Sequence, residues 1–368
     1  MNKPAIAIAA GGTGGHFFPA KSLALQLTRR DYPVVFMTDK RIEDRELASW
    51  HDIRQFVIDS AGINKKTIMK KIGNTFSLMK GIIEARKILV QNHVSAIVGF
   101  GGYPSIPPLF ATRLLSKKNR PIIILHEGNA IIGKANAFLA PFATKIATSF
   151  PVTKGLSNSD KIVVTGLPVR PDITSLYPSV YKPPKETIHL LIWGGSLGAR
   201  IFGEIVPYAL GNLSLSLRKK LRITQQVRQE DIETITRCYQ KNEIKAELSP
   251  FLTNIGDLLQ KAHLVIGRSG GSSTAELALT NRPAILVPYP HAANKEQYYN
   301  AQILEKEGAA WLINQPDFTV ANLTQLINDL FSHPEKLQKA ALSHKTAYPN
   351  AAKNLADLIE RSVADLSS

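Results

Sequence analysis

A loop of glycines followed by a histidine is the first stretch of the chain that indicates chemistry. The sequence GGTGGH lies between an apolar run and a helical pattern, and it contains Gly11, Gly12, Gly14, Gly15 and His16. Glycines can adopt left-handed conformations, let a ligand approach the main chain, and direct N–H groups at an anion near the positive end of a helix. We therefore expect a phosphate-binding loop beside a side chain that titrates near neutral pH, the alternative being a tight turn without a ligand.

Two more stretches in the first half follow apolar runs. Gly101 and Gly102 precede Pro104, which can begin a helix, and Ser105, whose hydroxyl could serve a second anion pocket. The sequence HEGN, residues 126–129, places three polar side chains at the end of another run. A polyol substrate would satisfy such a cluster, and a hydrogen-bonded turn is the alternative.

The second half contains three comparable stretches. GGSLGA, residues 194–199, repeats the glycine loop with Ser196 as an added donor. IGRSGGSSTAEL, residues 266–277, is dense in small donors and places Glu276 in the expected first turn of a helix, where it could bind ribose hydroxyls or only favour the helix dipole. Asn294 and Gln297 stand at a further helix start, where they could bind sugar hydroxyls or, for Asn294, cap the helix.

Length and composition limit the class of protein. A chain of 368 residues predicts two domains, and the single cysteine, Cys238, gives neither a disulfide nor a structural zinc site. The N-terminal apolar run is too short for a membrane span and lacks a cleavage signal, so we expect a cytosolic protein. The net charge of +16 points to an anionic partner, but no helix-turn-helix, zinc-finger or RNP pattern supports nucleic-acid binding.

A basic amphipathic segment offers another explanation for the charge. Residues 61–89 carry apolar side chains at helical spacing, one acid, Glu84, and interleaved lysines at positions 65, 66, 70, 71 and 80. This composition is typical of a helix that lies on anionic lipid. The alternative is a helix whose apolar stripe packs on the core while its lysines are solvated.

Short apolar runs alternate with helical patterns along both halves of the chain. The expected strands are 5–10, 34–38, 55–58, 96–100, 122–126, 145–148 and 162–165, and then 190–193, 221–224, 245–248, 264–266, 284–287 and 310–313. A helix is expected from Pro19 onward, and the proline-rich residues 174–189 suggest a linker. The pattern predicts an α/β protein of two doubly wound domains facing across a cleft, with ligands at the carboxyl ends of the strands.

Six motifs together closely resemble those of the bacterial peptidoglycan glycosyltransferases, the MurG family of the GT-B superfamily. They are GGTGGHFFPA, GFGGYPS, HEGNAIIGKAN, GGSLGA, RSGGSSTAEL and QYYNA. Their order and spacing match over nearly the whole chain. The resemblance implies a GT-B fold with two Rossmann-like domains: an N-terminal acceptor and membrane-binding domain (1–165), a linker (166–188), a C-terminal UDP-sugar-binding domain (189–345), and a C-terminal helix (346–368) that packs back on the N-terminal domain.

The resemblance also implies an activity. Such an enzyme transfers N-acetylglucosamine from UDP-GlcNAc to the 4-hydroxyl of the muramoyl sugar of lipid I, with inversion, and forms lipid II in peptidoglycan synthesis. It would attach peripherally to the cytoplasmic face of the cell membrane, at an anionic surface, with cell-wall synthesis and division proteins as candidate partners. It needs no cofactor, and no metal is expected because no DxD pair lies near the site.

The family pattern assigns roles to individual residues. His16 matches the usual candidate for the catalytic base. The acceptor-binding positions are Gly14, Gly15, His16, Gly102, Tyr103 and Ser105. The donor-binding positions are Thr13, Gly14, Gly15, Asn129, Arg170, Ser196, Leu252, Ser269, Gly270, Thr274, Glu276 and Gln297.

Four motifs depart from the family pattern. Gly128 stands in HEGN where HEQN is usual, and Leu167 stands in GLPVR where GNPVR is usual. Leu197 replaces the glutamine of GGSQGA, and Lys295-Glu296-Gln297 replaces the common N-H-Q order. These changes affect individual polar contacts rather than the type of reaction.

Three other functions compete with this assignment. One is a GT-B transferase that acts on another lipid or a natural product. Another is a dinucleotide-dependent oxidoreductase, which the first loop disfavours because it reads GGTGGH instead of GxGxxG and because Asp39 is the only candidate to bind the ribose. The third is a basic nucleic-acid binder without catalysis.

Overall fold

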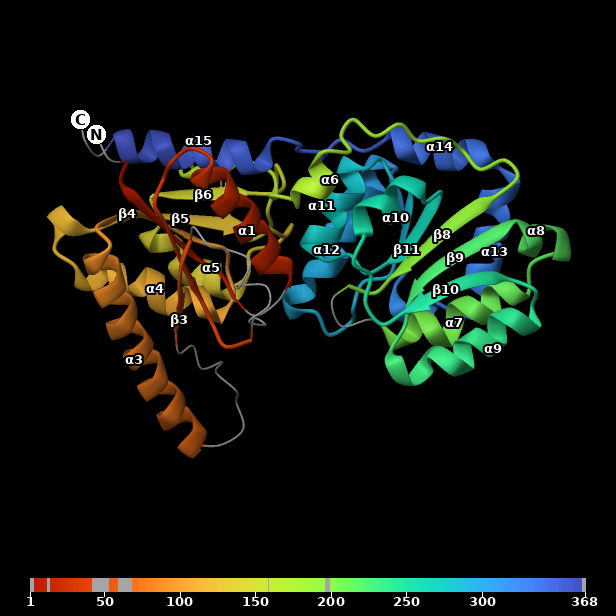
Figure 1. Ribbon diagram of the computed structural model, residues 1–368, viewed down its shortest axis with the longest axis horizontal. Helices are drawn as coiled ribbons and strands as arrows, with labels where there is room; N and C mark the ends of the chain where they lie inside the picture. Colours follow the sequence, from red (N-terminus) through yellow and green to blue (C-terminus); the bar gives the residue numbers. More distant parts are fainter. Residues whose placement is uncertain are drawn as a thin grey trace. The chain divides into compact units, whose positions relative to one another are not determined.

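The structure is a computed structural model that describes residues 3–11, 14–41, 53–58, 68–157, 159–195 and 199–365 of the chain. It divides into two compact units: residues 1–170 with 350–368 form unit 1, and residues 171–349 form unit 2. Each unit has a parallel sheet with helices on its faces (Figure 1). The predicted pair of doubly wound α/β domains is therefore confirmed.

Unit 1 is built on a sheet of strand order β3-β2-β1-β4-β5-β6-β7. Its strands are β1 (Ala5–Ala9), β2 (Val34–Thr38), β3 (Arg54–Val57), β4 (Val94–Gly99), β5 (Ile122–Glu127), β6 (Lys145–Thr148) and β7 (Ile162–Val164). Its helices are α1 (Gly14–Thr28), α3 (Ile68–Gln91), α4 (Ile106–Ala111), α5 (Lys134–Leu139) and α15 (Ala351–Ala364), with 3₁₀ turns η1 (Tyr103–Ser105), η2 (Thr112–Leu114), η3 (Lys117–Asn119) and η4 (Ala140–Phe142).

Alternate residues of the strands of unit 1 form two apolar layers. Ile6 and Ile8 pack under α1 and α15, whereas Ala7 and Ala9 pack on the other face with α3 and α4. Burial on both faces explains why these strands read as continuous apolar runs. Helix α15 belongs to the first layer through a set of buried side chains, Leu355, Ala356, Leu358 and Ile359.

Unit 2 has a sheet of strand order β10-β9-β8-β11-β12-β13. Its strands are β8 (Ile188–Trp193), β9 (Leu221–Gln226), β10 (Lys245–Ser249), β11 (Leu264–Gly267), β12 (Ala284–Leu286) and β13 (Ala310–Leu312). Its helices are α6 (Pro171–Thr174), α7 (Arg200–Gly211), α8 (Leu215–Lys220), α9 (Ile232–Lys241), α10 (Ile255–Lys261), α11 (Gly271–Leu279), α12 (Glu296–Glu307), α13 (Val320–Ser332) and α14 (Pro334–Leu342), with 3₁₀ turns η5 (Gln229–Asp231), η6 (Ala293–Lys295) and η7 (Gln315–Asp317).

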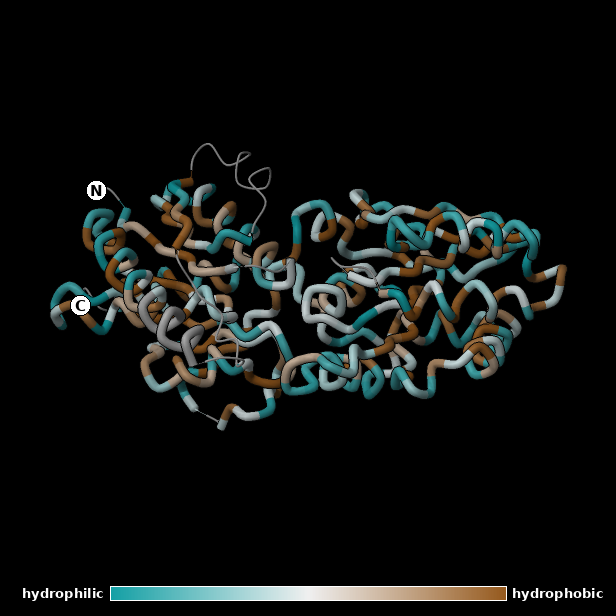
Figure 2. Tube along the Cα trace, turned by 90° about the horizontal axis from the view of Figure 1, so that it is seen from below, coloured by the Kyte–Doolittle hydropathy of each residue, from teal (hydrophilic) through white to brown (hydrophobic). Residues whose placement is uncertain are grey.

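The main core of unit 2 lies on one face of its sheet. Ile188, Leu190 and Ile192 of β8 pack there against α7, α9 and α13. Figure 2 shows hydrophobic residues running through the interior of this unit and hydrophilic residues along its outside. Residues 171–188, most of the expected linker, belong to unit 2, where the Tyr181 hydroxyl donates to the carbonyl of His263 at 2.9 Å.

The first helix begins earlier than the sequence suggests. It starts at Gly14, so Gly14 and Gly15 belong to the helix and Pro19 is its sixth residue instead of its first. Pro19 lacks an N–H and therefore removes one backbone hydrogen bond from the second turn, which a helix tolerates near its N-terminus better than at its centre. The first-turn N–H groups of α1 are thus those of the glycine loop itself.

The amphipathic segment is partly described. Residues 61–67 lie outside the described residues, and residues 68–91 form helix α3. In its second half, Ala85, Ile88 and Leu89 are buried in the core, while Met79 and Ile83 are exposed by 57% and 53%. This half therefore has one apolar face in the core and other apolar side chains at the surface.

Candidate functional site

The glycine loop of unit 1 needs small residues for close packing. A Cβ on Gly11 would overlap Cγ of Pro104, which lies in the turn after β4. Gly11 and Gly15 have no positive φ angle, so the expected left-handed conformation is not present at these two positions. Gly12 and Thr13 lie outside the described residues.

His16 lies against the turn that follows β4. A Cβ on Gly101 would be 3.6 Å from Nε2 of His16, and one on Gly102 would be 3.7 Å from its Nδ1. Gly101 and Gly102 have φ angles of 82° and 72°, so glycine is required at both positions. The histidine and the second glycine pair, which are far apart in the sequence, therefore form one site at the carboxyl ends of neighbouring strands β1 and β4.

The electrostatic environment keeps His16 neutral. Burial lowers the pKa of His16 from its ordinary value of 6.5, and the positive charge of Arg41 lowers it further. Arg41 is held in place by the buried carboxylate of Asp39, to which its Nε donates at 2.7 Å. A neutral imidazole can accept a proton, which is the property that a general base requires.

Glu127 organises the loop after β5. Its Oε1 accepts from the backbone N–H of Asn129 at 3.0 Å and from Asn129 Nδ2 at 3.2 Å. Its Oε2 accepts from the N–H of Gly133 at 2.9 Å and from Asn136 Nδ2 at 2.8 Å. Burial raises the pKa of Glu127, and these four hydrogen bonds oppose the rise.

Asn136 connects this network to His16. Its Nδ2 also donates to the carbonyl of His126 at 3.1 Å, and a Cβ on Gly101 would lie 3.4 Å from the same Nδ2. His126 is buried, stacks on Phe100 and bonds through Nε2 to the carbonyl of Gly166 at 2.9 Å. Burial lowers the pKa of His126 to about 4. Sequence reasoning singled out the HEGN cluster, which contains Glu127, but gave no role to Asn136.

Two of the predicted residues in unit 1, Ser105 and Arg170, have other surroundings than expected. Ser105 is completely buried and its hydroxyl donates to the carbonyl of Gly102 at 2.8 Å, so it shapes the turn and offers no surface to an acceptor. Tyr103, by contrast, is exposed by 42%. Arg170, expected to contact the donor, belongs to unit 1, where its guanidinium carbon lies 5.3 Å from the centre of the Phe18 ring.

The second site lies at the carboxyl ends of β8, β11 and β12, which are neighbours in the sheet of unit 2. Gly195 follows β8 with a φ angle of 82°, and a Cβ on Gly267 at the end of β11 would be 2.9 Å from the carbonyl oxygen of Trp193. Both glycines are thus required by the backbone. Ser196 and Leu197 lie outside the described residues.

Arg268 connects the loops of this site through hydrogen bonds. The sequence analysis gave this residue no role. Its Nη1 donates to the carbonyls of Val287 and Pro288 at 2.9 and 3.1 Å, and its Nη2 donates to Oε1 of Gln315 at 2.8 Å. Its guanidinium also lies over the ring of Tyr289. Arg268 therefore joins the loop after β11 to the end of β12.

The predicted donor-binding hydroxyls are used inside the protein. Ser269 is completely buried and donates to the carbonyl of Gln297 at 2.7 Å. The hydroxyl of Thr274, 1% exposed, lies 2.9 Å from the carbonyl of Gly271. These two hydroxyls therefore fix the glycine-rich turn, and the expected contact of the two residues with the donor stays a prediction.

Glu276 is the sixth residue of α11, so it lies in the second turn and not in the first as expected. Its side chain is nearly buried, at 5% exposure. The helix begins at Gly271, immediately after the turn that Ser269 and Thr274 fix. Placement in the second turn weakens the interaction with the helix dipole as a reason for a carboxylate here.

The start of α12 also differs from expectation. Its N-cap is Lys295, not Asn294, and both residues have left-handed conformations with φ angles of 57° and 53°. Gln297 is the second residue of the helix, and its Oε1 accepts from the N–H of Tyr289 at 3.0 Å. Gln297 and Gly270 thus belong to one cluster of loops, while Leu252 follows the exposed Phe251 beyond β10.

The chain matches a known family over most of its length. Residues 6–148 match the glycosyltransferase family 28 N-terminal domain, and residues 189–361 match the glycosyltransferase family 28 C-terminal domain. A UDP-N-acetylglucosamine–N-acetylmuramyl-(pentapeptide) pyrophosphoryl-undecaprenol N-acetylglucosamine transferase from Gluconobacter oxydans is 52% identical over 98% of this chain and 99% of its own length. The transferase of the same name from Granulibacter bethesdensis is 43% identical over 97% and 94%. The crystal structure of MurG from Acinetobacter baumannii is similar with a TM-score of 0.78 and 29% identity, covering 97% of this chain and 99% of its own.

Proposed function

The chain belongs to glycosyltransferase family 28, and from that membership we infer that it is a GT-B N-acetylglucosaminyltransferase of the MurG type. It transfers N-acetylglucosamine from UDP-GlcNAc to lipid I, the undecaprenyl-pyrophosphate-linked N-acetylmuramyl pentapeptide, and forms lipid II. The observation that carries this conclusion is the 52% identity to a transferase of that name along almost the entire chain.

The site of unit 1 is proposed to hold the acceptor, with His16 as the general base. The neutral imidazole accepts the proton of the muramoyl 4-hydroxyl as that oxygen forms its bond to the anomeric carbon. The bond from this carbon to the UDP oxygen breaks, and its electron pair leaves with the diphosphate. Attack from the face opposite UDP inverts the anomeric centre. The backbone of Gly102 and the first turn of α1 are suited to the acceptor pyrophosphate.

The site of unit 2 is proposed to hold UDP-GlcNAc. The turn that begins α11 directs the positive end of a nine-residue helix at the position of the diphosphate. Glu276 is the candidate for the ribose hydroxyls, and Gln297 is the candidate for the sugar. The hydroxyls of Ser269 and Thr274 donate to backbone carbonyls. The two residues therefore contribute to the proposed site by shaping the turn.

A dinucleotide-dependent oxidoreductase is disfavoured by the environment of Asp39. The only predicted ribose-binding acid of such an enzyme is nearly buried, and its carboxylate accepts from the backbone N–H of Arg41 at 3.1 Å as well as from the Arg41 guanidinium. A carboxylate held in this way is poorly placed for ribose hydroxyls. The positive charge of Arg41 in this pair lowers the pKa of His16, which suits the base of a transferase.

An anionic membrane surface is the proposed location of unit 1. No helix among the described residues has the length and apolar character needed to cross a bilayer. Met79 and Ile83 of α3 and Leu114 of η2 are exposed, and Nε of Arg86 donates to the carbonyl of Leu114 at 3.5 Å, which joins the two elements. Exposed apolar residues with basic neighbours favour peripheral binding to anionic lipid.

Transfer of labelled N-acetylglucosamine to a lipid I analogue tests the activity. We expect product with UDP-GlcNAc and lipid I, and none when lipid I is replaced by an undecaprenyl phosphate that lacks the muramoyl sugar. His16→Ala should lower kcat by about 100-fold to 10,000-fold while UDP-GlcNAc binding stays unchanged. The control is His333→Ala, which changes an exposed histidine between α13 and α14. Equal turnover by wild type and His16→Ala would contradict the role of His16.

Co-sedimentation with vesicles tests the membrane surface. We expect the chain to sediment with phosphatidylglycerol vesicles, and Met79→Asp with Ile83→Asp to reduce the bound fraction. Val152→Asp with Val180→Asp removes comparably exposed apolar side chains outside α3 and serves as the control. Equal binding by both double variants and the wild type would contradict the proposed surface.

A further inference from the structure

A pocket of unit 2 lies on the face of its sheet opposite the main core. In β8 and β9, every second residue points into the core. The residues between them line this pocket: His189, Leu191, Arg222 and Thr224. Helix α10 covers the β8 side of this face through Leu258 and Lys261, while Lys245 and Glu247 of β10 stay exposed. The pocket has a volume of about 390 Å³, within the size range of small-molecule sites.

The position of the pocket separates it from the proposed donor site. Arg222 and Lys245 are the second residue of β9 and the first of β10, and Thr187 comes directly before β8, so the pocket is near the amino-terminal ends of the strands. The donor-site glycines follow the carboxyl ends of β8 and β11. A strand of six residues is about 20 Å long, which places the two sites at opposite ends of the sheet.

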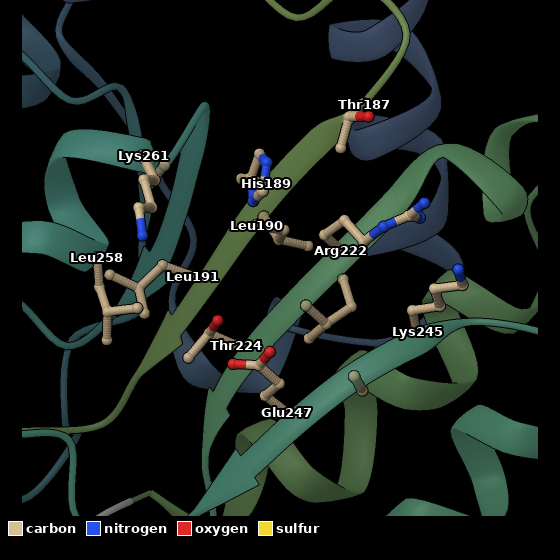
Figure 3. Close-up of a pocket in the computed structure, with 13 residues that line it drawn as sticks. Thr187, His189, Leu190, Leu191, Arg222, Thr224, Lys245, Glu247, Leu258 and Lys261 are labelled. Atoms are coloured by element: carbon tan, nitrogen blue, oxygen red, sulfur yellow. The ribbon is translucent and has the colours of Figure 1, made fainter.

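The lining of the pocket is divided by chemistry, as Figure 3 shows. Leu191 and Leu258 lie on one side beside Lys261, and the charged ends of Arg222 and Lys245 lie on the other. The hydroxyl of Thr224 and the carboxylate of Glu247 lie between these two sides. A side with two leucines and one lysine, a middle with hydrogen-bonding oxygens and a side with two cations thus follow one another across a single pocket.

The cations of the pocket are available to a ligand. Among the ion pairs of the described residues, none includes Arg222, Lys245, Lys261 or Glu247. Nη1 of Arg222 donates to the carbonyls of Lys219 and Leu221, which fixes the guanidinium at the rim and leaves its other nitrogens for an anion. Burial lowers the pKa of His189, the positive charges of Arg222 and Lys261 lower it further, and the charge of Glu247 opposes them.

We propose that this pocket binds a nucleoside phosphate as a second ligand site, independent of the transfer reaction. The base packs against Leu191 and Leu258, the ribose hydroxyls donate to the Glu247 carboxylate, and the phosphate accepts from Arg222 and Lys245. Each part of the ligand thus meets the lining that its chemistry requires: apolar surface for the base, a carboxylate for vicinal hydroxyls and a guanidinium for the phosphate. An inorganic anion would leave the apolar side and Glu247 unused.

Calorimetric titration of the full chain with AMP, in the presence of saturating UDP to fill the donor site, tests this proposal. We expect AMP to bind, and adenosine and inorganic pyrophosphate each to bind at least about tenfold more weakly, because each lacks one of the recognised groups. Arg222→Gln with Lys245→Gln should weaken AMP binding by about tenfold or more. Hydrogen exchange should slow in residues 221–226 and 245–249 when AMP is bound.

The matched control is Arg237→Gln with Lys241→Gln, which removes the same charge from α9 on the other face of the sheet. We expect this variant to bind AMP as the wild type does, and both double variants to bind UDP-GlcNAc normally, which reports that unit 2 is folded. The proposal is overturned by the absence of AMP binding, by pyrophosphate binding as tightly as AMP, by displacement of AMP by UDP, or by equal losses in the two double variants.

Discussion

Gly128 and Leu167 are in direct contact: a Cβ on residue 128 would lie 3.2 Å from Cδ1 of Leu167. Both belong to motifs in which the sequence analysis expected a different residue: HEGN for HEQN and GLPVR for GNPVR. Leu167 is buried, with 3% exposure. The two departures therefore belong together, because the missing side chain at 128 leaves the space that Leu167 occupies.

The contact predicts that substitutions at the two positions are coupled. Gly128→Ala alone should destabilise unit 1 by about 1 kcal/mol, because Leu167 must move to admit the methyl group. In a Leu167→Ala background, which itself costs about 2 to 5 kcal/mol, the same change should cost nothing. Native-state hydrogen exchange of the β5 and β6 amides measures the free energies of opening. Additive effects of the two substitutions would show that the residues do not interact.

The buried carboxylate of Glu127 predicts a large effect of removing its charge. Glu127→Gln replaces an acceptor oxygen with an NH₂ group that faces the N–H donors of Asn129 or Asn136, so at least one buried donor loses its partner. We expect a loss of about 2 to 4 kcal/mol in the free energy of unfolding of unit 1. Asn129 and Asn136 should exchange their amide protons faster in this variant.

Glu84→Gln is the control for Glu127→Gln because it is the same substitution on the partly exposed surface of α3. It should change stability by less than about 0.5 kcal/mol. Glu127→Gln with wild-type stability would mean that the four hydrogen bonds do not hold the loop. Thermal unfolding of both variants, followed by calorimetry, provides a second measurement.

The sequence predicted the strands more accurately than the site. Residues 122–126 were expected as a strand and β5 spans Ile122–Glu127, because burial on both faces of a parallel sheet leaves a continuous apolar run. The link between Glu127 and Asn136 is tertiary, and nothing in the sequence shows which polar side chain turns inward. The hydroxyls of Ser105 and Ser269 were expected to donate to a ligand, but they donate to backbone carbonyls.

The pair of Arg41 and His16 predicts a pH dependence. Burial and the charge of Arg41 place the pKa of His16 below 6.5, so the neutral base persists at pH values where an ordinary histidine is protonated. Arg41→Gln removes a positive charge and exposes His16 to the carboxylate of Asp39, and both changes raise the pKa. The acidic limb of kcat/KM should therefore move to higher pH, by about half a unit to one unit.

Arg41→Lys is the control for this shift, because it keeps the positive charge. Its pH profile of kcat/KM should follow that of the wild type, whereas its absolute rate need not. An acidic limb that stays in place in Arg41→Gln would show that His16 does not titrate in the step measured. The alkaline limb, which reports other groups, should be the same in all three proteins.

The expected independence from metal ions gives a further prediction. In the proposed mechanism the helix N-terminus of α11 and the cations of the chain offset the charge of the leaving diphosphate. We expect excess EDTA to leave the rate of transfer unchanged once the buffer is corrected for ionic strength. A loss of activity that Mg²⁺ restores would assign this role to a metal ion instead.

Lys295 has a left-handed backbone at the start of α12, which predicts that glycine is favoured there. A residue with a Cβ is disfavoured in this conformation by about 1 kcal/mol, whereas glycine adopts it freely. Lys295→Gly should therefore stabilise unit 2 by about 0.5 to 1 kcal/mol, and the β-branched Lys295→Val should destabilise it. Lys306→Gly, the same change inside α12, is the control and should cost about 1 kcal/mol. Native-state hydrogen exchange of the β11 and β12 amides measures the stability of all three variants. If Lys295→Gly lost as much stability as Lys306→Gly, the contacts of the Lys295 side chain would contribute more than the strain of its backbone costs.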